Sequence, residues 1–133
     1  MATPGRAPQA YHEAQVLGSD RRELVVLMFR ALVRYLVRAE QAMGRRDFEA
    51  KADALARANA VLSELICSLD EKTGGELAAS LRRLYLWMQA ELLEVDLNDD
   101  GERLGTLIEL TRGLARTWEE ALRRCRQEES TVA

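Results

Sequence analysis

Four long stretches with helical periodicity, separated by links of only about three or four residues, constrain what this chain can fold into. Within each stretch apolar residues recur at spacings of three and four, and no proline follows Pro8. The pattern predicts helices over about 20–43, 47–69, 73–97 and 99–126. So short a link cannot carry the chain back along a helix about 35 Å long. We therefore predict an all-α fold, an antiparallel up-down-up-down four-helix bundle.

The predicted helix ends are marked by residues that favour caps. Short acceptors that can bind the amide groups of a first turn precede the stretches: Asp20, Asp47, Thr73 and Asp99–Asp100. With Glu23 and Glu76 three residues later, the first and third of these form capping boxes. Gly44 and Asn98 are expected to take the left-handed conformation that ends the first and third helices.

The two ends of the chain differ in composition from the helical part. Residues 1–18 contain both prolines and have no sustained period, which predicts a flexible N-terminal arm. Residues 127–133 are mainly polar and are expected to fray as a tail. Residues 19–126 between them form the predicted bundle, which is large enough to fold without a metal or disulfide.

Two of the predicted helices carry more apolar surface than a bundle core requires. In the first, apolar residues cover an arc of roughly 240°, whereas a core-facing helix needs an arc of only about 100° to 140°. In the third, a second apolar stripe lies opposite the core stripe. Exposed apolar stripes of this kind bind the helices of other chains. The candidate binding residues are Val25, Val26, Phe29, Val33, Val37, Leu86, Ala90, Leu93 and Leu97.

The surplus apolar surface is also compatible with two arrangements that involve no client. The bundle can be irregular, so that the arm or the tail covers the second stripe. Alternatively, the stripes of two copies can meet in a homodimer. We expect a monomer or a weak homodimer.

The residues that enzymes and metal sites need are scarce. The single histidine, His12, falls in the arm, so no Ser-His-Asp or Cys-His arrangement has a rigid base. The run from Asp96 to Asp100 resembles the first half of a calcium loop, but position twelve is Leu107, where calcium needs a carboxylate. We expect this run to end one helix and cap the next. The sequence predicts no enzyme activity, no metal site and no cofactor.

Charge and hydropathy narrow the class of partner. A net charge of −3 gives no overall field that would attract nucleic acid. No apolar run is long enough to span a membrane, and the first residues do not follow the pattern of a secretory signal. We expect a cytoplasmic protein without membrane insertion that binds other proteins.

Short motifs spread over residues 10–121 resemble the FliS family of flagellar secretion chaperones. They are Ala10-Tyr11, Glu23 to Met28, Asp47 with Lys51, Glu64-Leu65, Ser68-Leu69-Asp70, Gly74-Gly75-Glu76, Leu84-Tyr85 with Met88, Asn98-Asp99 and Trp118. Their order and spacing together carry the resemblance.

The resemblance implies a cytosolic chaperone that binds the C-terminal segment of flagellin, prevents premature filament assembly and keeps flagellin competent for type III export. It gives Tyr11 a role as an arm residue that lies over apolar surface and is moved aside by the client. Other flagellar regulators and the export gate are further candidate partners. The alternative is a homo-oligomeric helical bundle, a structural or interaction protein without a flagellin client.

Overall fold

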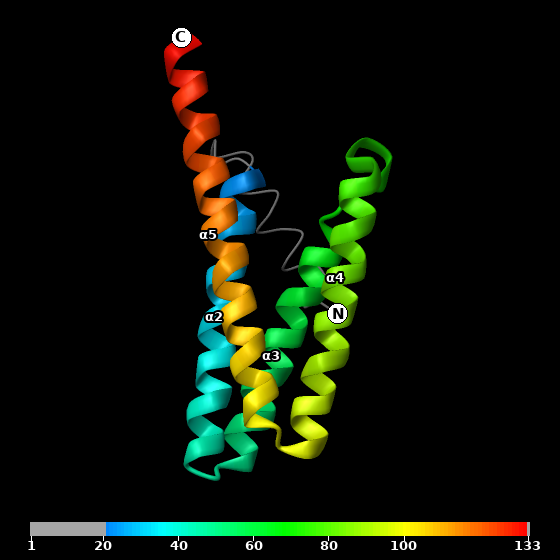
Figure 1. The fold of residues 1–133 in the computed structure, drawn as a ribbon, viewed down its shortest axis with the longest axis vertical. Coiled ribbons are helices and arrows are strands. Elements are labelled where there is room, and N and C mark those ends of the chain that lie inside the picture. The colour runs from blue at the N-terminus through cyan, green and yellow to red at the C-terminus, as the bar shows by residue number, and fades with distance from the viewer. Residues whose placement is uncertain (1–20, 133) are drawn as a thin grey trace, which may run out of the picture.

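The computed structural model describes residues 21–132, with side chains described as far as residue 131. Four helices account for nearly all of this range: α2 (Arg21–Gly44), α3 (Phe48–Cys67), α4 (Glu71–Asn98) and α5 (Gly101–Val132). In Figure 1 the chain descends along α2, returns along α3, descends along α4 and rises along α5. The described range contains no strand, and the predicted all-α class is confirmed. The predicted arm and the Asp20 cap lie outside the described residues.

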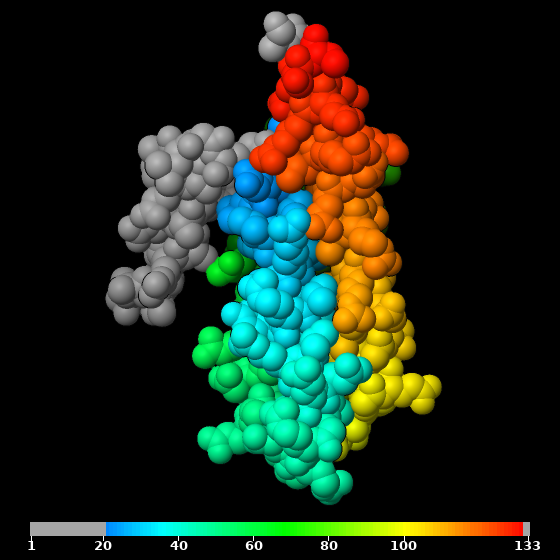
Figure 2. Space-filling model, turned by 90° about the vertical axis from the view of Figure 1, so that its left-hand side faces the viewer, coloured from blue at the N-terminus to red at the C-terminus, as the bar shows by residue number. Residues whose placement is uncertain are grey.

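The wide apolar arc of α2 matches the position of this helix between two neighbouring helices. It packs extensively against both α3 and α5, and Figure 2 shows α2 and α5 side by side along one face. Its buried residues are Val26, Phe29, Leu32, Leu36, Ala39 and Ala42. Among the large apolar side chains of this fully described helix, Leu27 is exposed and the others are buried or partly buried. Much of the arc is therefore used inside the bundle, and Val26 and Phe29, which were expected to face a partner, are buried in it.

Two of the predicted N-terminal caps are present in the structure. The carboxylate of Asp47 accepts a hydrogen bond from the Ala50 amide at 3.1 Å, so α3 starts where the sequence places it. The carboxylate of Asp100 accepts from the Arg103 amide at 3.0 Å and caps α5.

The left-handed residues that end α2 and α4 differ from the prediction. Arg46, with φ 58°, follows α2 in place of Gly44, and the Asp47 amide donates to the Ala42 carbonyl at 2.9 Å. Asp99, with φ 52°, follows α4 in place of Asn98. Both helices run one residue further than expected, to Gly44 and Asn98.

Helix α4 begins earlier than the predicted Thr73 cap. The Asp70 carboxylate accepts from the amides of Lys72 and Thr73 at 3.1 and 3.4 Å and caps the helix at Glu71. The Thr73 hydroxyl and backbone also hold the pKa of the Asp70 carboxyl below its usual value. At Gly75 the backbone leaves helical geometry, with φ 55° and ψ −131°, so the first turn is kinked away from the rest of α4.

Replacing Gly75 with alanine is expected to destabilise the protein by about 1–3 kcal/mol, because an L-residue rarely adopts this backbone conformation. The midpoint and slope of urea unfolding measure the loss. Gly105, which lies in α5 with no close neighbour around an added methyl group, is the matched control. Since alanine favours helix, Gly105→Ala should leave stability unchanged or raise it. Equal effects of the two substitutions would show that the Gly75 conformation imposes no strain.

Helix α5 extends through most of the predicted tail, to Val132. Two ion pairs join the last turns of α5 to the first turn of α2: Arg126 Nη2 lies 2.7 Å from Glu23 Oε2, and Arg22 Nη2 lies 3.1 Å from Glu129 Oε2. The expected end at residue 126 is therefore six residues too early.

Candidate protein-binding surface

One face of α4 carries a row of exposed apolar side chains. Leu86, Leu93 and Leu97 are 46%, 58% and 70% exposed, and Ala90 between them is also exposed. Their spacing of four, three and four residues places them on one side of the helix, opposite the buried Tyr85, Met88 and Leu92. We call Leu86, Ala90, Leu93 and Leu97 the α4 strip. Their exposure agrees with the sequence pattern, and their role in binding stays a prediction.

Polar contacts to α3 fix the rotation of α4 that exposes this strip. Gln89 Nε2 donates to Ser63 Oγ at 2.9 Å and to the Asn59 carbonyl at 3.3 Å. Further along, Lys51 Nζ lies 3.4 Å from Asp96 Oδ1 and is largely buried. A rotation of α4 that buried the strip would break these contacts and would strand the Lys51 ammonium in a buried site.

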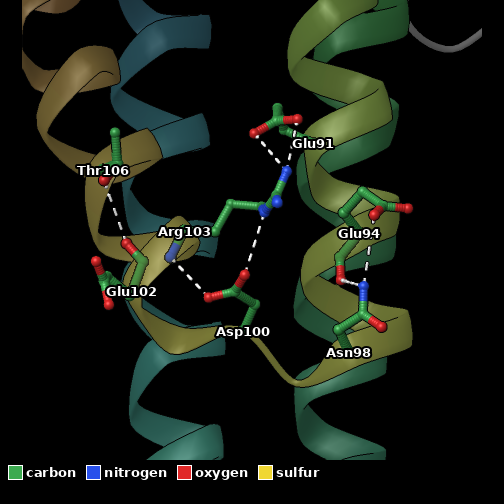
Figure 3. Close-up of polar contacts among 7 residues, drawn as sticks. All are labelled: Glu91, Glu94, Asn98, Asp100, Glu102, Arg103 and Thr106. Atoms are coloured by element: carbon green, nitrogen blue, oxygen red, sulfur yellow. Dashed lines mark hydrogen bonds and ion pairs between the residues drawn. The ribbon is translucent and has the colours of Figure 1, made fainter.

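Polar contacts between α4 and the turn that joins it to α5 also hold α4 in this rotation (Figure 3). Arg103 Nη1 contacts both Glu91 carboxylate oxygens at 3.0 and 2.9 Å, and Arg103 Nε lies 3.2 Å from Asp100 Oδ2. The Arg103 amide, and then its guanidinium, hold the pKa of the Asp100 carboxyl below its usual value. Asn98 Nδ2 donates to the Glu94 carbonyl at 3.2 Å.

The residues that resemble half a calcium loop therefore cap and join two helices, as their sequence predicts. Across residues 21–131, no cluster of three His, Cys, Asp or Glu side chains is placed to hold a metal ion. None of the helices in that part of the chain is long and apolar enough to cross a membrane.

A cavity of about 290 Å³ lies at one end of the bundle, where all four helices contribute to its lining. We call this cavity the end groove. Its walls are mainly apolar and include Val25, Leu65, Leu69, Leu77, Leu81, Tyr85 and Trp118. The kinked turn before Gly75 supplies Thr73 and Gly74 to its rim. Burial raises the pKa of the Tyr85 phenol to about 12, so this side chain stays neutral in the groove.

The predicted binding residues of α2 lie in different surroundings in the structure. Val25 lines the end groove, but Val26 and Phe29 are buried in the core. Val37 is partly buried against the core, and Val33 lies in a hollow between α2 and α5. Phe29 therefore does not form binding surface in this structure, because Tyr85 of α4 and Trp118 of α5 pack near its ring. Val26 is 3% exposed and lines a hollow between α2 and α5. Tyr11 lies outside the described residues.

Sequence reasoning missed two exposed side chains of α4. Leu77 is not among the predicted binding residues, yet it is 65% exposed and lines the end groove two residues after the kink at Gly75. The Gly74-Gly75 pair was the available signal, since adjacent glycines interrupt a helix. Trp87 is exposed and falls in neither apolar stripe of α4, so its periodicity gave no indication of its place.

Comparison with known proteins gives a consistent result. Residues 4–125 match the family described as flagellar protein FliS. The flagellar secretion chaperone FliS of Campylobacter jejuni is 30% identical over 86% of this chain and 89% of its own. The corresponding proteins of Escherichia coli and Salmonella typhimurium are 32% and 30% identical, over 83% and 81% of this chain and 82% and 81% of their own.

Proposed function

Because this chain belongs to the FliS family of flagellar secretion chaperones, which are not enzymes, we propose that it binds the C-terminal segment of flagellin. In this proposal, binding in the cytoplasm prevents premature polymerisation and keeps flagellin competent for type III export. Other flagellar regulators and the export gate are further candidate partners.

The α4 strip is the observation that carries the proposal. Leu86, Leu93 and Leu97 are exposed along about three turns of one helix. Contiguous exposed apolar residues of this kind mark protein-binding sites. An amphipathic client helix with apolar residues at spacings of three and four would match this row in length and in chemistry.

The end groove supports a client that is longer than one helix. A segment that orders on binding loses conformational entropy, so it needs about 1,000–3,000 Å² of contact. The α4 strip alone is too narrow to supply this area. Leu77 and Leu81, which line the end groove, lie on the same helix as the α4 strip, so the groove provides a second apolar contact. Exposed Trp87 adds a side chain of the type that often dominates binding energy.

The proposal is tested by mixing the protein with the C-terminal segment of flagellin from its own organism. We expect a one-to-one complex in size-exclusion chromatography with light scattering, and slower seeded polymerisation of intact flagellin when the protein is equimolar. A flagellin truncated before this segment is the control and should not bind. Failure of the segment to comigrate at micromolar concentrations would contradict the proposal.

Light scattering of the protein alone tests the alternative of a homo-oligomeric bundle. A monomer, or a dimer that dissociates on dilution, is consistent with a surface kept free for a client. A dimer that resists dilution and excludes the flagellin segment would favour the alternative.

Replacing Tyr11 with alanine is expected to leave helicity unchanged and to alter affinity for the flagellin segment by a small factor. The reason is that an aromatic arm residue can cover apolar surface but is not needed for the bundle core. Circular dichroism and calorimetric titration measure the two effects, with Tyr11→Phe as the conservative control. A large loss of helicity would show that Tyr11 belongs to the core.

A further inference from the structure

A second hollowed surface runs along the seam between α2 and α5, on the face shown in Figure 2. Two cavities of about 350 and 260 Å³ adjoin there and share Arg30 and Glu119. Among the described residues that line them, Glu119 is the single acidic one. The lining also contains six arginines: Arg30, Arg34, Arg112, Arg116, Arg123 and Arg126. We call this surface the α2–α5 seam.

The floor of the seam is apolar. Val26 and Leu122 contribute to the larger cavity, and Val33 and Ala115 contribute to the smaller one. Cations therefore border a strip of apolar side chains on both helices. An amphipathic segment fits such a surface, because its apolar side can cover the floor while its polar side meets the arginines.

The cations of the seam are only partly neutralised within the molecule. Four of the six arginines are paired: Arg30 with Glu119, Arg112 with Glu109, Arg123 with Glu120, and Arg126 with Glu23 at 2.7 Å. Arg34 and Arg116 are exposed and form no ion pair with any residue in the part of the chain described by the structure. The middle of the seam thus carries positive charge, although the whole chain has a net charge of −3.

The spacing of these arginines along each helix adds repulsion between their positive charges. Arg30 and Arg34 are four residues apart on α2, and Arg112 and Arg116 are four residues apart on α5. Like charges at this spacing on a helix repel each other. An anionic partner would remove this repulsion and would use the guanidinium groups, which bind carboxylates in bidentate geometry.

We propose that the α2–α5 seam docks an acidic amphipathic segment of a partner protein. The apolar floor favours a polypeptide over a nucleic acid, whose phosphates would gain nothing from Val33 and Ala115. Glu119 at the junction of the two cavities also opposes a continuous track of phosphates. In Figure 1, α4 lies on the other side of the bundle from α2, so the seam and the α4 strip can be occupied at the same time.

The test uses the full chain and a labelled synthetic peptide of about four helical turns, with leucine at helical spacing and glutamate elsewhere. Fluorescence anisotropy should detect binding in about 0.1 M salt and weaker binding in about 0.5 M salt. The substitutions Arg34→Glu and Arg116→Glu together should weaken binding at least about tenfold. They break no ion pair to another described residue, so helicity should be retained.

The matched control carries Arg82→Glu and Arg83→Glu, two exposed arginines on α4, and changes the net charge by the same amount. It should alter peptide affinity less than about twofold. Equal weakening by the two double variants would overturn the proposal, because it would show attraction without a site. Equal affinity for a peptide with glutamine in place of glutamate would also overturn it.

Three further outcomes would assign the seam to another occupant and overturn the proposal. A short DNA duplex could bind more tightly than the peptide and lose binding in the Arg34/Arg116 variant. Light scattering could show a dimer that the same substitutions dissociate. The substitutions could abolish binding of the flagellin segment, which we expect them to leave unchanged. Failure of flagellin to bind the unmodified protein would instead count against the proposed function and leave the seam unaffected.

Discussion

Replacing Phe29 with alanine is expected to lower the free energy of unfolding by about 3–5 kcal/mol, the usual cost of removing a buried aromatic ring. The Phe29 side chain is 0% exposed. Its ring centroid lies 6.1 Å from that of Tyr85 on α4 and 6.4 Å from that of Trp118 on α5. The cavity left by alanine would therefore open where three helices meet. Urea unfolding followed by helical circular dichroism measures the loss.

Phe48, the other phenylalanine of the chain, is the matched control, since it is 50% exposed at the start of α3. Phe48→Ala should cost about 1 kcal/mol, because it removes partial burial and the cation–π contacts with Arg46 and Lys51. Phe29→Ala should reduce binding of the flagellin segment only as far as it unfolds the protein. A stable Phe29→Ala variant that no longer binds flagellin would place Phe29 in the binding surface, as the sequence pattern alone suggested.

Replacing both Leu86 and Leu93 with serine is expected to weaken binding of the flagellin segment by about 1.5–3 kcal/mol, roughly ten- to a hundredfold. Both side chains are about half exposed, so each can still bury about half of its area against a client. The free energy of unfolding should fall by only about 1 kcal/mol, because serine is a slightly weaker helix former and little core packing is lost. Calorimetric titration and urea unfolding give the two values.

Leu27 on α2 provides the control for this experiment. It is 51% exposed, close to the 58% of Leu93, but it lies outside both the α4 strip and the end groove. Leu27→Ser should leave flagellin affinity within about twofold, whereas Leu93→Ser alone should weaken binding several-fold. If the two single substitutions weakened binding equally, exposed apolar area in general, and not the α4 strip, would be responsible.

Local sequence chemistry was sufficient to predict the helices and the α4 strip. Asp47 and Asp100 cap their helices because a short carboxylate at that position reaches the amides of the first turn. The spacing of Leu86, Ala90, Leu93 and Leu97 places them opposite the buried side of α4, whichever helices form the core. These features depend on neighbours within one or two turns, so the pattern contains them.

Features that depend on the neighbouring helices were not predictable in this way. The arc of α2 indicated a partner, but the pattern could not show that α3 and α5 would occupy two of its sides and bury Val26 and Phe29. The positive-φ residues that follow α2 and α4, Arg46 and Asp99, were missed because Gly44 and Asn98 have the stronger intrinsic preference for positive φ. The exposure of Leu77 at the end groove, just after the kink at Gly75, also depends on how α4 packs on the bundle.

The α2–α5 seam could be recognised only in the structure. Along the sequence Arg34 and Arg116 are far apart, and Arg116 belongs to a helix on which acidic residues are also frequent. Packing of α2 against α5 brings the two rows of arginine together, and the nearby glutamates pair with four of the six arginines and leave Arg34 and Arg116 without an ion pair to a described residue. The local excess of positive charge is therefore a property of the fold.

Methyl NMR of leucine in the free and flagellin-bound protein tests most directly whether the exposed apolar side chains of α4 form the client site. On addition of the flagellin segment, the resonances of Leu86, Leu93 and Leu97 should shift or broaden in a one-to-one titration, while those of buried Leu104 and Leu107 should hardly change. If a complex forms and the three exposed leucines keep their free-state resonances, the client binds elsewhere and the α4 strip is not its site.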